Sequence, residues 1–169
     1  MKTIDKLLSE KMMTLVRSNS QSEGQALADA IVEAGVKVIE ITLTTPGAHK
    51  IIEQLLKNKD LLVGAGTVRT VKEVKKMEDI GVSFIVSPNT NEDVIVATKK
   101  LKLVSMPGVS TPSEVAIAEE SGADILKLFP ATILGPDHLK MLREPFPGNR
   151  WCPTAGITLD SIPRWFEAG

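Results

Sequence analysis

Three side chains in this sequence could together act on a carbonyl compound: Lys127, Glu40 and Arg17. Lys127 stands inside an apolar run at 125–129, and Glu40 inside another at 36–43. Apolar surroundings favour the neutral amine of a lysine, which attacks carbonyl carbon, and a buried carboxylate can move protons. The alternatives are a structural ion pair between Lys127 and Glu40, or a charged amine that reaches solvent at a strand end.

The elements that would position these side chains follow from an internal repeat. Three segments, at 33–41, 79–86 and 120–128, pass from an acidic residue through a glycine into a short apolar run. Glycine suits the left-handed end of a helix, so each segment predicts a helix followed by a strand. Between these joints, apolar residues recur every three or four positions, which is typical of helices that bury one face.

The predicted strands are nearly continuous apolar runs, which indicates a parallel sheet covered by helices on both faces. They span residues 12–17, 36–43, 61–65, 82–87, 103–107, 125–129 and 151–154. Strands roughly 20 to 27 residues apart favour an α/β fold of the (β/α)8 TIM-barrel type over an open doubly wound sheet. Because the chain stops at Gly169, at another helix-to-strand joint, we expect one barrel domain over 1–169, incomplete at its C-terminus. Its eighth strand and last helix would be absent.

Composition narrows the setting in which such a barrel would act. The chain has 20 Lys and Arg against 21 Asp and Glu, a formal net charge of −1, so neither nucleic acid nor a membrane surface is an expected partner. The only cysteine, Cys152, cannot form an internal disulfide, and charged residues interrupt positions 1–13. We therefore expect no signal peptide or membrane span, and a cytoplasmic protein.

Strand pleating brings Lys127 and Glu40 together. Alternate side chains share a face, so Lys127 lies with Ile125 and Phe129, while Glu40 lies with Val38 on the second strand. The opposite faces are aliphatic and must meet the helix layer, which leaves both charged side chains inside the barrel. Polar residues near the carboxyl ends of barrel strands usually build the active site.

Further candidates stand at those carboxyl ends. Arg17 follows the first strand, where its guanidinium suits a carboxylate ligand or, alternatively, a rim salt bridge. Ala155 and Gly156 follow the seventh strand and precede a predicted helix at 159–166, a place where barrels often bind phosphate. Glycine or proline, which also serves ordinary tight turns, follows other strands at 64–67, 87–89 and 106–108.

Six segments form a distinctive set: IEITL (39–43), GAGTV (64–68), FIVSP (84–88), PGVSTPSE (107–114), LKLFP (126–130) and PTAGI (153–157). Together they resemble the 2-keto-3-deoxy-6-phosphogluconate (KDPG) / 4-hydroxy-2-oxoglutarate (KHG) aldolases. The resemblance implies a class I aldolase that needs no metal or other cofactor and is usually a homotrimer. It implies that Lys127 forms the Schiff base and that Glu40 moves protons. The positions that match the family's pyruvate pocket are Arg17, Thr67, Pro88 and Phe129.

The implied reaction is cleavage of KDPG, a small phosphorylated keto acid, to pyruvate and glyceraldehyde 3-phosphate in the Entner-Doudoroff route. Cleavage of 4-hydroxy-2-oxoglutarate to pyruvate and glyoxylate is a second implied activity. The amides of Ala155 and Gly156 would bind the phosphate. Two positions depart from the family pattern: Thr44 replaces a frequent arginine, and Ala155 replaces a glycine of the phosphate loop, where a methyl group could crowd the ligand.

Other functions stay open on the sequence alone. One is an aldolase for the galactonate epimer. Another is a phosphosugar isomerase or epimerase that uses Glu40 as its base and has no need of the Lys127 amine. A third is a non-catalytic fragment, because a barrel without its last strand has two unpaired edges. His49 and His138 fall on predicted helices away from the strand ends, so we expect both to be surface or structural residues.

Overall fold

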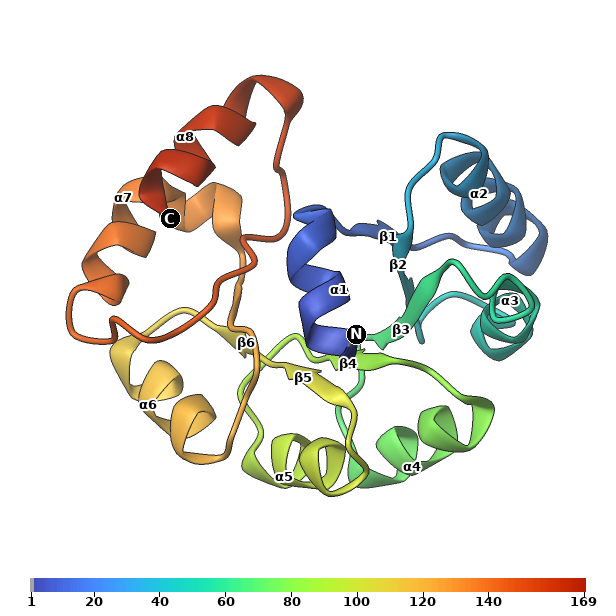
Figure 1. The fold of residues 1–169 in the computed structure, drawn as a ribbon, viewed down its shortest axis with the longest axis horizontal. Helices are drawn as coiled ribbons and strands as arrows, with labels where there is room; N and C mark the ends of the chain where they lie inside the picture. The colour runs from blue at the N-terminus through green and yellow to red at the C-terminus, as the bar shows by residue number, and fades with distance from the viewer. Residues whose placement is uncertain (1) are drawn as a thin grey trace.

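The computed structural model describes residues 2–169 as a curved wall of parallel strands surrounded by helices (Figure 1). The strands are β1 (Thr14–Val16), β2 (Val38–Thr42), β3 (Leu62–Gly66), β4 (Phe84–Val86), β5 (Val104–Met106), β6 (Gly108–Val109) and β7 (Lys127–Leu128). The helices are α1 (Thr3–Glu10), α2 (Gln21–Glu33), α3 (Ala48–Leu55), α4 (Val71–Ile80), α5 (Glu92–Lys100), α6 (Pro112–Glu120), α7 (Ala131–Arg143) and α8 (Ile162–Ala168), with a 3-10 turn η1 (Leu159–Ser161). None of the helices within residues 2–169 combines the length and apolarity needed to cross a bilayer.

The wall runs β1-β2-β3-β4-β5 and continues through β6 and β7. The N–H of Lys127 donates to the carbonyl of Pro107, between β5 and β6, at 2.9 Å. On the other side of β7, the N–H of Cys152 donates to the carbonyl of Leu126 at 2.8 Å. The predicted strand at 151–154 therefore lies where it was expected, although only one ladder bridge forms there.

The repeated helix-to-strand joint is confirmed. Its three glycines, Gly35, Gly81 and Gly122, have φ angles of 84°, 102° and 86°. This left-handed conformation is costly for other residues and ends each helix so that the chain can turn back into the next strand.

The two faces of the strands pack against different layers, as pleating predicts. Ile39 and Ile41 belong to the apolar cluster shared with α2, α3 and α4, whereas Leu126 and Leu128 pack with α6 and α7. The opposite faces form a separate cluster inside the barrel. It contains Val38, Leu62, Phe84, Val86, Val104 and Met106 from the strands, and Ile125 from the segment just before β7.

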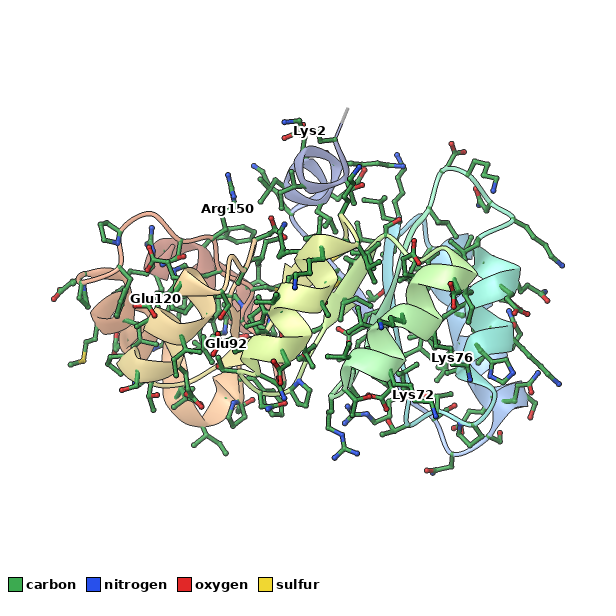
Figure 2. The ribbon with its side chains drawn as sticks, turned by 90° about the horizontal axis from the view of Figure 1, so that it is seen from below. Lys2, Lys72, Lys76, Glu92, Glu120 and Arg150 are labelled. Atoms are coloured by element: carbon green, nitrogen blue, oxygen red, sulfur yellow. The ribbon has the colours of Figure 1, made fainter. Side chains whose placement is uncertain are left out.

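Helix α1 closes the amino end of this interior, a role that the sequence did not predict. In Figure 1 it lies inside the ring of helices. Figure 2 shows Lys2, the residue before α1, at one end of the barrel and Lys72 of α4 towards the other. Leu7 joins the interior cluster. Lys6 Nζ donates to the carbonyl of Asp60, just before β3, at 2.8 Å. The carboxyl ends of the strands, on the other side, remain uncovered by this helix.

The barrel is not closed within residues 2–169. No strand in that range joins β1 to the segment at 151–154, and no helix lies between α8 and α2 (Figure 1). The fold is therefore a (β/α)8-type barrel whose eighth strand and last helix are absent from this chain, as predicted. Leu15 shows the consequence: it is aligned with Glu40 and faces the interior, yet it is 39% exposed.

Candidate active site

Lys127 begins β7 and lies on the interior face of the barrel. Its side chain is only 6% exposed, and Nζ lies 5.3 Å from the centroid of the Phe129 ring. Among residues 2–169 Lys127 forms no salt bridge. The structure therefore contains neither the ion pair with Glu40 nor the solvent-exposed amine that the sequence allowed. Lys127 is a buried amine with no carboxylate bonded to it.

Glu40 lies in the middle of β2 and is 1% exposed. Gly66, at the end of β3, leaves room for it, because a Cβ at that position would overlap with Oε1 of the carboxylate. The other oxygen, Oε2, is buried and accepts no hydrogen bond from the described residues.

This environment decides the protonation of Glu40. Burial raises the pKa of Glu40, because a carboxylate without water or donors is poorly stabilised. The nearby positive charges of Lys127 and then Arg17 oppose that rise. Glu40 therefore keeps its proton to a higher pH than an exposed glutamate does, which suits a group that both gives and accepts protons.

Arg17 and Thr67 come together from the ends of β1 and β3. Arg17 Nη2 donates to Thr67 Oγ1 at 3.3 Å, and Thr67 has a left-handed φ of 60°. Arg17 forms no salt bridge with any residue in 2–169, so the rim ion pair is not seen. A guanidinium and a hydroxyl side by side, close enough to Glu40 to influence its charge, can bind a carboxylate.

Pro88 and Phe129 both lie close to the β6–β7 pair that carries Lys127. Gly108 is aligned with Lys127 across β6 and β7, and a Cβ on Gly108 would overlap with the carbonyl of Pro88. The loop after β4 is thus packed closely against the strand next to Lys127. The Phe129 ring lies against the Lys127 amine. The structure brings both predicted residues to the mouth of the barrel.

The loop after the segment at 151–154 contains Ala155 and Gly156. Both residues have left-handed φ angles, 81° and 72°. Thr132, in α7, holds this loop by donating from Oγ1 to the carbonyl of Ala155 at 2.5 Å. The amides of Ala155 and Gly156 donate to no described residue, so both are free for an anion. The predicted helix at 159–166 is instead η1 followed by α8, which shifts the regular helix three residues further along.

Cys152 is a site residue that the sequence analysis did not assign. The bridge between β7 and the segment at 151–154 sets Cys152 beside Lys127 on the interior face. Burial raises the pKa of the thiol, contact with Thr154 lowers it, Glu40 raises it and Lys127 lowers it. Side chains alternate along a strand, so Cys152 and Thr154 share the face that lies next to Lys127. That alternation is the signal that could have identified Cys152 and Thr154 as site residues.

The two histidines differ in their surroundings. His49 is exposed, as expected. His138 is half-buried, and its Nε2 lies 2.7 Å from the carbonyl of Ser110, directly after β6. The prediction that His138 lies away from the strand ends is wrong, since the second half of α7, beyond the kink at Gly135, sets His138 against the residue that follows β6. Within residues 2–169 no group of three or more His, Cys, Asp and Glu side chains is arranged to hold a metal ion.

The fold and the site together define a class: an α/β barrel with an unpaired lysine in its interior, a buried glutamate beside it and an arginine at its mouth. Comparison with known proteins agrees with this class and makes it more specific. The model of the KDPG and KHG aldolase family matches residues 3–169. The chain belongs to the KDPG/KHG aldolase family.

Similar proteins are named for two different compounds, the phosphogalactonate and the phosphogluconate. The chain is 35% identical over 144 residues to the probable 2-dehydro-3-deoxy-6-phosphogalactonate aldolase of Rhizobium meliloti, which covers 84% of this chain and 68% of the relative. It is 35% identical over 147 residues to the 2-dehydro-3-deoxy-phosphogluconate aldolase of Zymomonas mobilis, which covers 86% and 71%.

A solved structure shows the same barrel with a reaction intermediate. The KDPG aldolase from Legionella pneumophila, with pyruvate captured at low pH as a covalent carbinolamine intermediate, superposes with a TM-score of 0.79. It is 31% identical in sequence and covers 91% of this chain and 75% of its own.

Proposed function

We propose that this chain is a class I aldolase that cleaves KDPG to pyruvate and glyceraldehyde 3-phosphate, with Lys127 as the Schiff-base residue. The observation that carries the proposal is the Lys127 amine, 6% exposed and free of any salt bridge with the described residues, beside a glutamate whose pKa is raised by burial. A structural ion pair would bond the two groups to each other. Here both are left available to a substrate.

The first step is addition of the Lys127 amine to the C2 ketone of the substrate. The nitrogen forms a bond to C2, the ketone oxygen takes up a proton, and a carbinolamine results. Loss of water then gives a protonated imine, which withdraws electrons from C3. The Legionella pneumophila relative holds pyruvate as a carbinolamine, the product of amine addition to a ketone. In this barrel Lys127 is a buried amine that faces the interior.

Glu40 carries out the proton transfers. As a carboxylate, Glu40 accepts the proton of the C4 hydroxyl and the C3–C4 bond breaks. The electron pair of that bond enters the imine and gives an enamine. Glyceraldehyde 3-phosphate leaves. Glu40 then returns the proton to C3, and water hydrolyses the pyruvyl imine to release pyruvate and the free amine. Because Oε2 accepts no hydrogen bond from the described residues, it is free to accept the substrate proton.

The remaining site residues hold the two ends of the substrate. Arg17 and Thr67 bind the pyruvyl carboxylate through the guanidinium and hydroxyl that already meet at 3.3 Å. Ala155 and Gly156 bind the phosphate through amides that have no partner in residues 2–169. Pro88 and Phe129 form the walls between these ends.

The proposal is tested by following pyruvate release from KDPG. Lys127→Ala should lose activity, and Lys100→Ala, a change of an exposed lysine on α5, should keep it. Release of pyruvate by the Lys127→Ala protein at the rate of the unchanged chain would refute the proposal.

A second substrate is favoured by the relative from Rhizobium meliloti, which is named for the galactonate compound. The two compounds differ in the configuration of one hydroxyl group. We propose that the same residues cleave both, and comparison of kcat/KM for the two epimers decides which one the site prefers. The same assay with 4-hydroxy-2-oxoglutarate tests the third substrate.

We also propose that residues 1–169 form one barrel domain, incomplete at its C-terminus, and that the protein assembles as a homotrimer in the cytoplasm. Two large apolar side chains in the last third of the chain are open to solvent: Ile133 in α7 is 82% exposed and Leu159 in η1 is 86% exposed. Exposed apolar groups of this size favour burial between subunits. Light scattering should give three chains per particle, and a single-chain mass would contradict the assembly.

A further inference from the structure

Two buried threonines, Thr42 and Thr45, lie at the carboxyl end of β2. Their side chains are 0% and 2% exposed, so their hydroxyl groups need partners inside the protein. Thr42 Oγ1 donates to the carbonyl of Val16 at 3.2 Å. The two hydroxyls lie 3.1 Å apart, and the N–H of Ser18 donates to Thr45 Oγ1 at 3.3 Å. The four groups form a continuous chain of hydrogen bonds.

The direction of that chain is fixed by its ends. The Ser18 N–H can only donate and the Val16 carbonyl can only accept. Thr45 therefore accepts from Ser18 and gives its single proton to Thr42, which gives its own to Val16. Thr44 donates a further hydrogen bond to Thr42 Oγ1 at 3.2 Å, so the Thr42 oxygen is fully used. We call this chain, from Ser18 through Thr45 and Thr42 to Val16, the hydroxyl relay.

Both ends of the hydroxyl relay adjoin Arg17. The ladder between β1 and β2 ends at Val16, so beyond that residue no strand hydrogen bond fixes the chain to β2. The relay takes over at this point and holds the backbone on both sides of Arg17. The only hydrogen bond of the Arg17 side chain to the described residues is the one to Thr67. The direction of the guanidinium therefore depends on how firmly its backbone is held.

Helix α2 presses on the same point. A Cβ on Gly24 would meet Ser18 Oγ at 2.8 Å and Thr45 Cγ2 at 3.0 Å. The absence of a side chain at Gly24 lets the helix pack directly onto one end of the hydroxyl relay. The backbone around Arg17 is thus fixed from β2 by hydrogen bonds and from α2 by packing.

We propose that Thr42 and Thr45 are positioning residues for the carboxylate end of the substrate, acting through Arg17. The inference rests on the proposed function, in which Arg17 binds that carboxylate. A small displacement of a guanidinium weakens a charge-assisted hydrogen bond strongly, since such bonds depend on distance and alignment. Loss of either hydroxyl should therefore weaken carboxylate binding while the Lys127 amine stays reactive.

The experiment compares imine trapping by borohydride with two ketones, pyruvate and hydroxyacetone, of which only pyruvate has a carboxylate. Thr42→Val and Thr45→Val should raise the pyruvate concentration that gives half-maximal trapping by roughly tenfold, the effect of a hydrogen bond worth about 1.4 kcal/mol. The hydroxyacetone dependence should stay unchanged. Thr42→Ser and Thr45→Ser keep the hydroxyl and should restore the pyruvate value.

Equal loss with both ketones in the valine variants, or no loss with either, would overturn the positioning role. If a valine variant does not fold, the matching alanine variant is used, with the same expected separation between the ketones. In an Arg17→Met background, Thr45→Val should add no further effect on pyruvate; an undiminished effect there would also overturn the inference. Failure of the proposed function looks different, because the unchanged chain would then show no trapping with pyruvate.

Discussion

Gly66 has no side chain at the place where the carboxylate of Glu40 lies. Strands β2 and β3 are aligned residue by residue, from Val38 with Leu62 to Thr42 with Gly66. The end of β3 therefore determines whether the glutamate of β2 can occupy the barrel interior. The glycine at the end of β3 thus leaves room for the carboxylate that we propose as the proton-transfer group.

Gly66→Ala is expected to displace Glu40 and reduce turnover. The added methyl group overlaps with Oε1, and forcing an extra methyl into a packed interior costs about 1–3 kcal/mol. We expect a lower melting temperature and a kcat reduced at least tenfold. Gly148→Ala is the matched control, because no atom lies within 4 Å of a Cβ there. Unchanged turnover in Gly66→Ala would contradict the link between this glycine and Glu40.

Glu40→Gln should separate proton transfer from imine formation. The amide keeps the shape of the side chain but cannot accept the proton, so we expect kcat to fall by roughly 10²–10⁴, while borohydride still traps pyruvate on Lys127. In the unchanged chain kcat/KM should rise with pH through the raised pKa of Glu40, and that limb should vanish in the variant. A variant that keeps the limb would show that another group is the base.

Glu40 should also make stability depend on pH. Because burial raises its pKa in the folded state above the unfolded value, the folded protein favours the protonated carboxyl group. The stabilisation is complete below the unfolded pKa and is lost as pH rises through the folded pKa. We therefore expect Glu40→Gln to melt at a higher temperature than the unchanged chain at neutral pH, and the difference to disappear in acid. A constant difference across pH would argue against this ionisation.

Ala155→Gly should relieve backbone strain in the loop after the segment at 151–154. Ala155 has a φ of 81°, a conformation that costs a residue with a Cβ about 1 kcal/mol or more. We expect greater resistance to urea and a lower KM for the phosphorylated substrate, since the methyl group leaves the predicted phosphate loop. KM for 4-hydroxy-2-oxoglutarate, which has no phosphate, is the internal control and should not change. An equal change in both KM values would remove the phosphate from the explanation.

Much of the barrel follows from local sequence patterns, and the exceptions have identifiable physical causes. The glycine joints and apolar runs predict each helix-to-strand unit because caps and burial act over a few residues. The predicted strand at 151–154 forms only one ladder bridge, although Cys152 and Thr154 donate to the carbonyls of Leu126 and Leu128. The N–H of Leu128 donates to no carbonyl of that segment, so the next bridge does not form. The role of α1 is invisible locally, because the packing of Leu7 against interior side chains from distant strands exists only in the assembled barrel.

The site divides in the same way. Pleating predicts that Lys127 and Glu40 face one interior, since the side-chain period of a strand is fixed. Whether they bond to each other depends on side-chain distances across the barrel, which strand periodicity does not set. The meeting of Arg17 with Thr67 and the hydroxyl relay behind it likewise depend on loops from different strands. Polar side chains in these loops have no periodicity from which a partner can be read.

The most direct test of the account is borohydride trapping with pyruvate, followed by mass mapping of the modified peptide. We predict one stable adduct of reduced pyruvyl imine, located on Lys127. Lys127→Ala should show none, and Lys127→Arg should show none because a guanidinium remains protonated and is no nucleophile, whereas Lys100→Ala should show the full adduct. An adduct on another residue, or none on the unchanged chain, would contradict the assignment of Lys127.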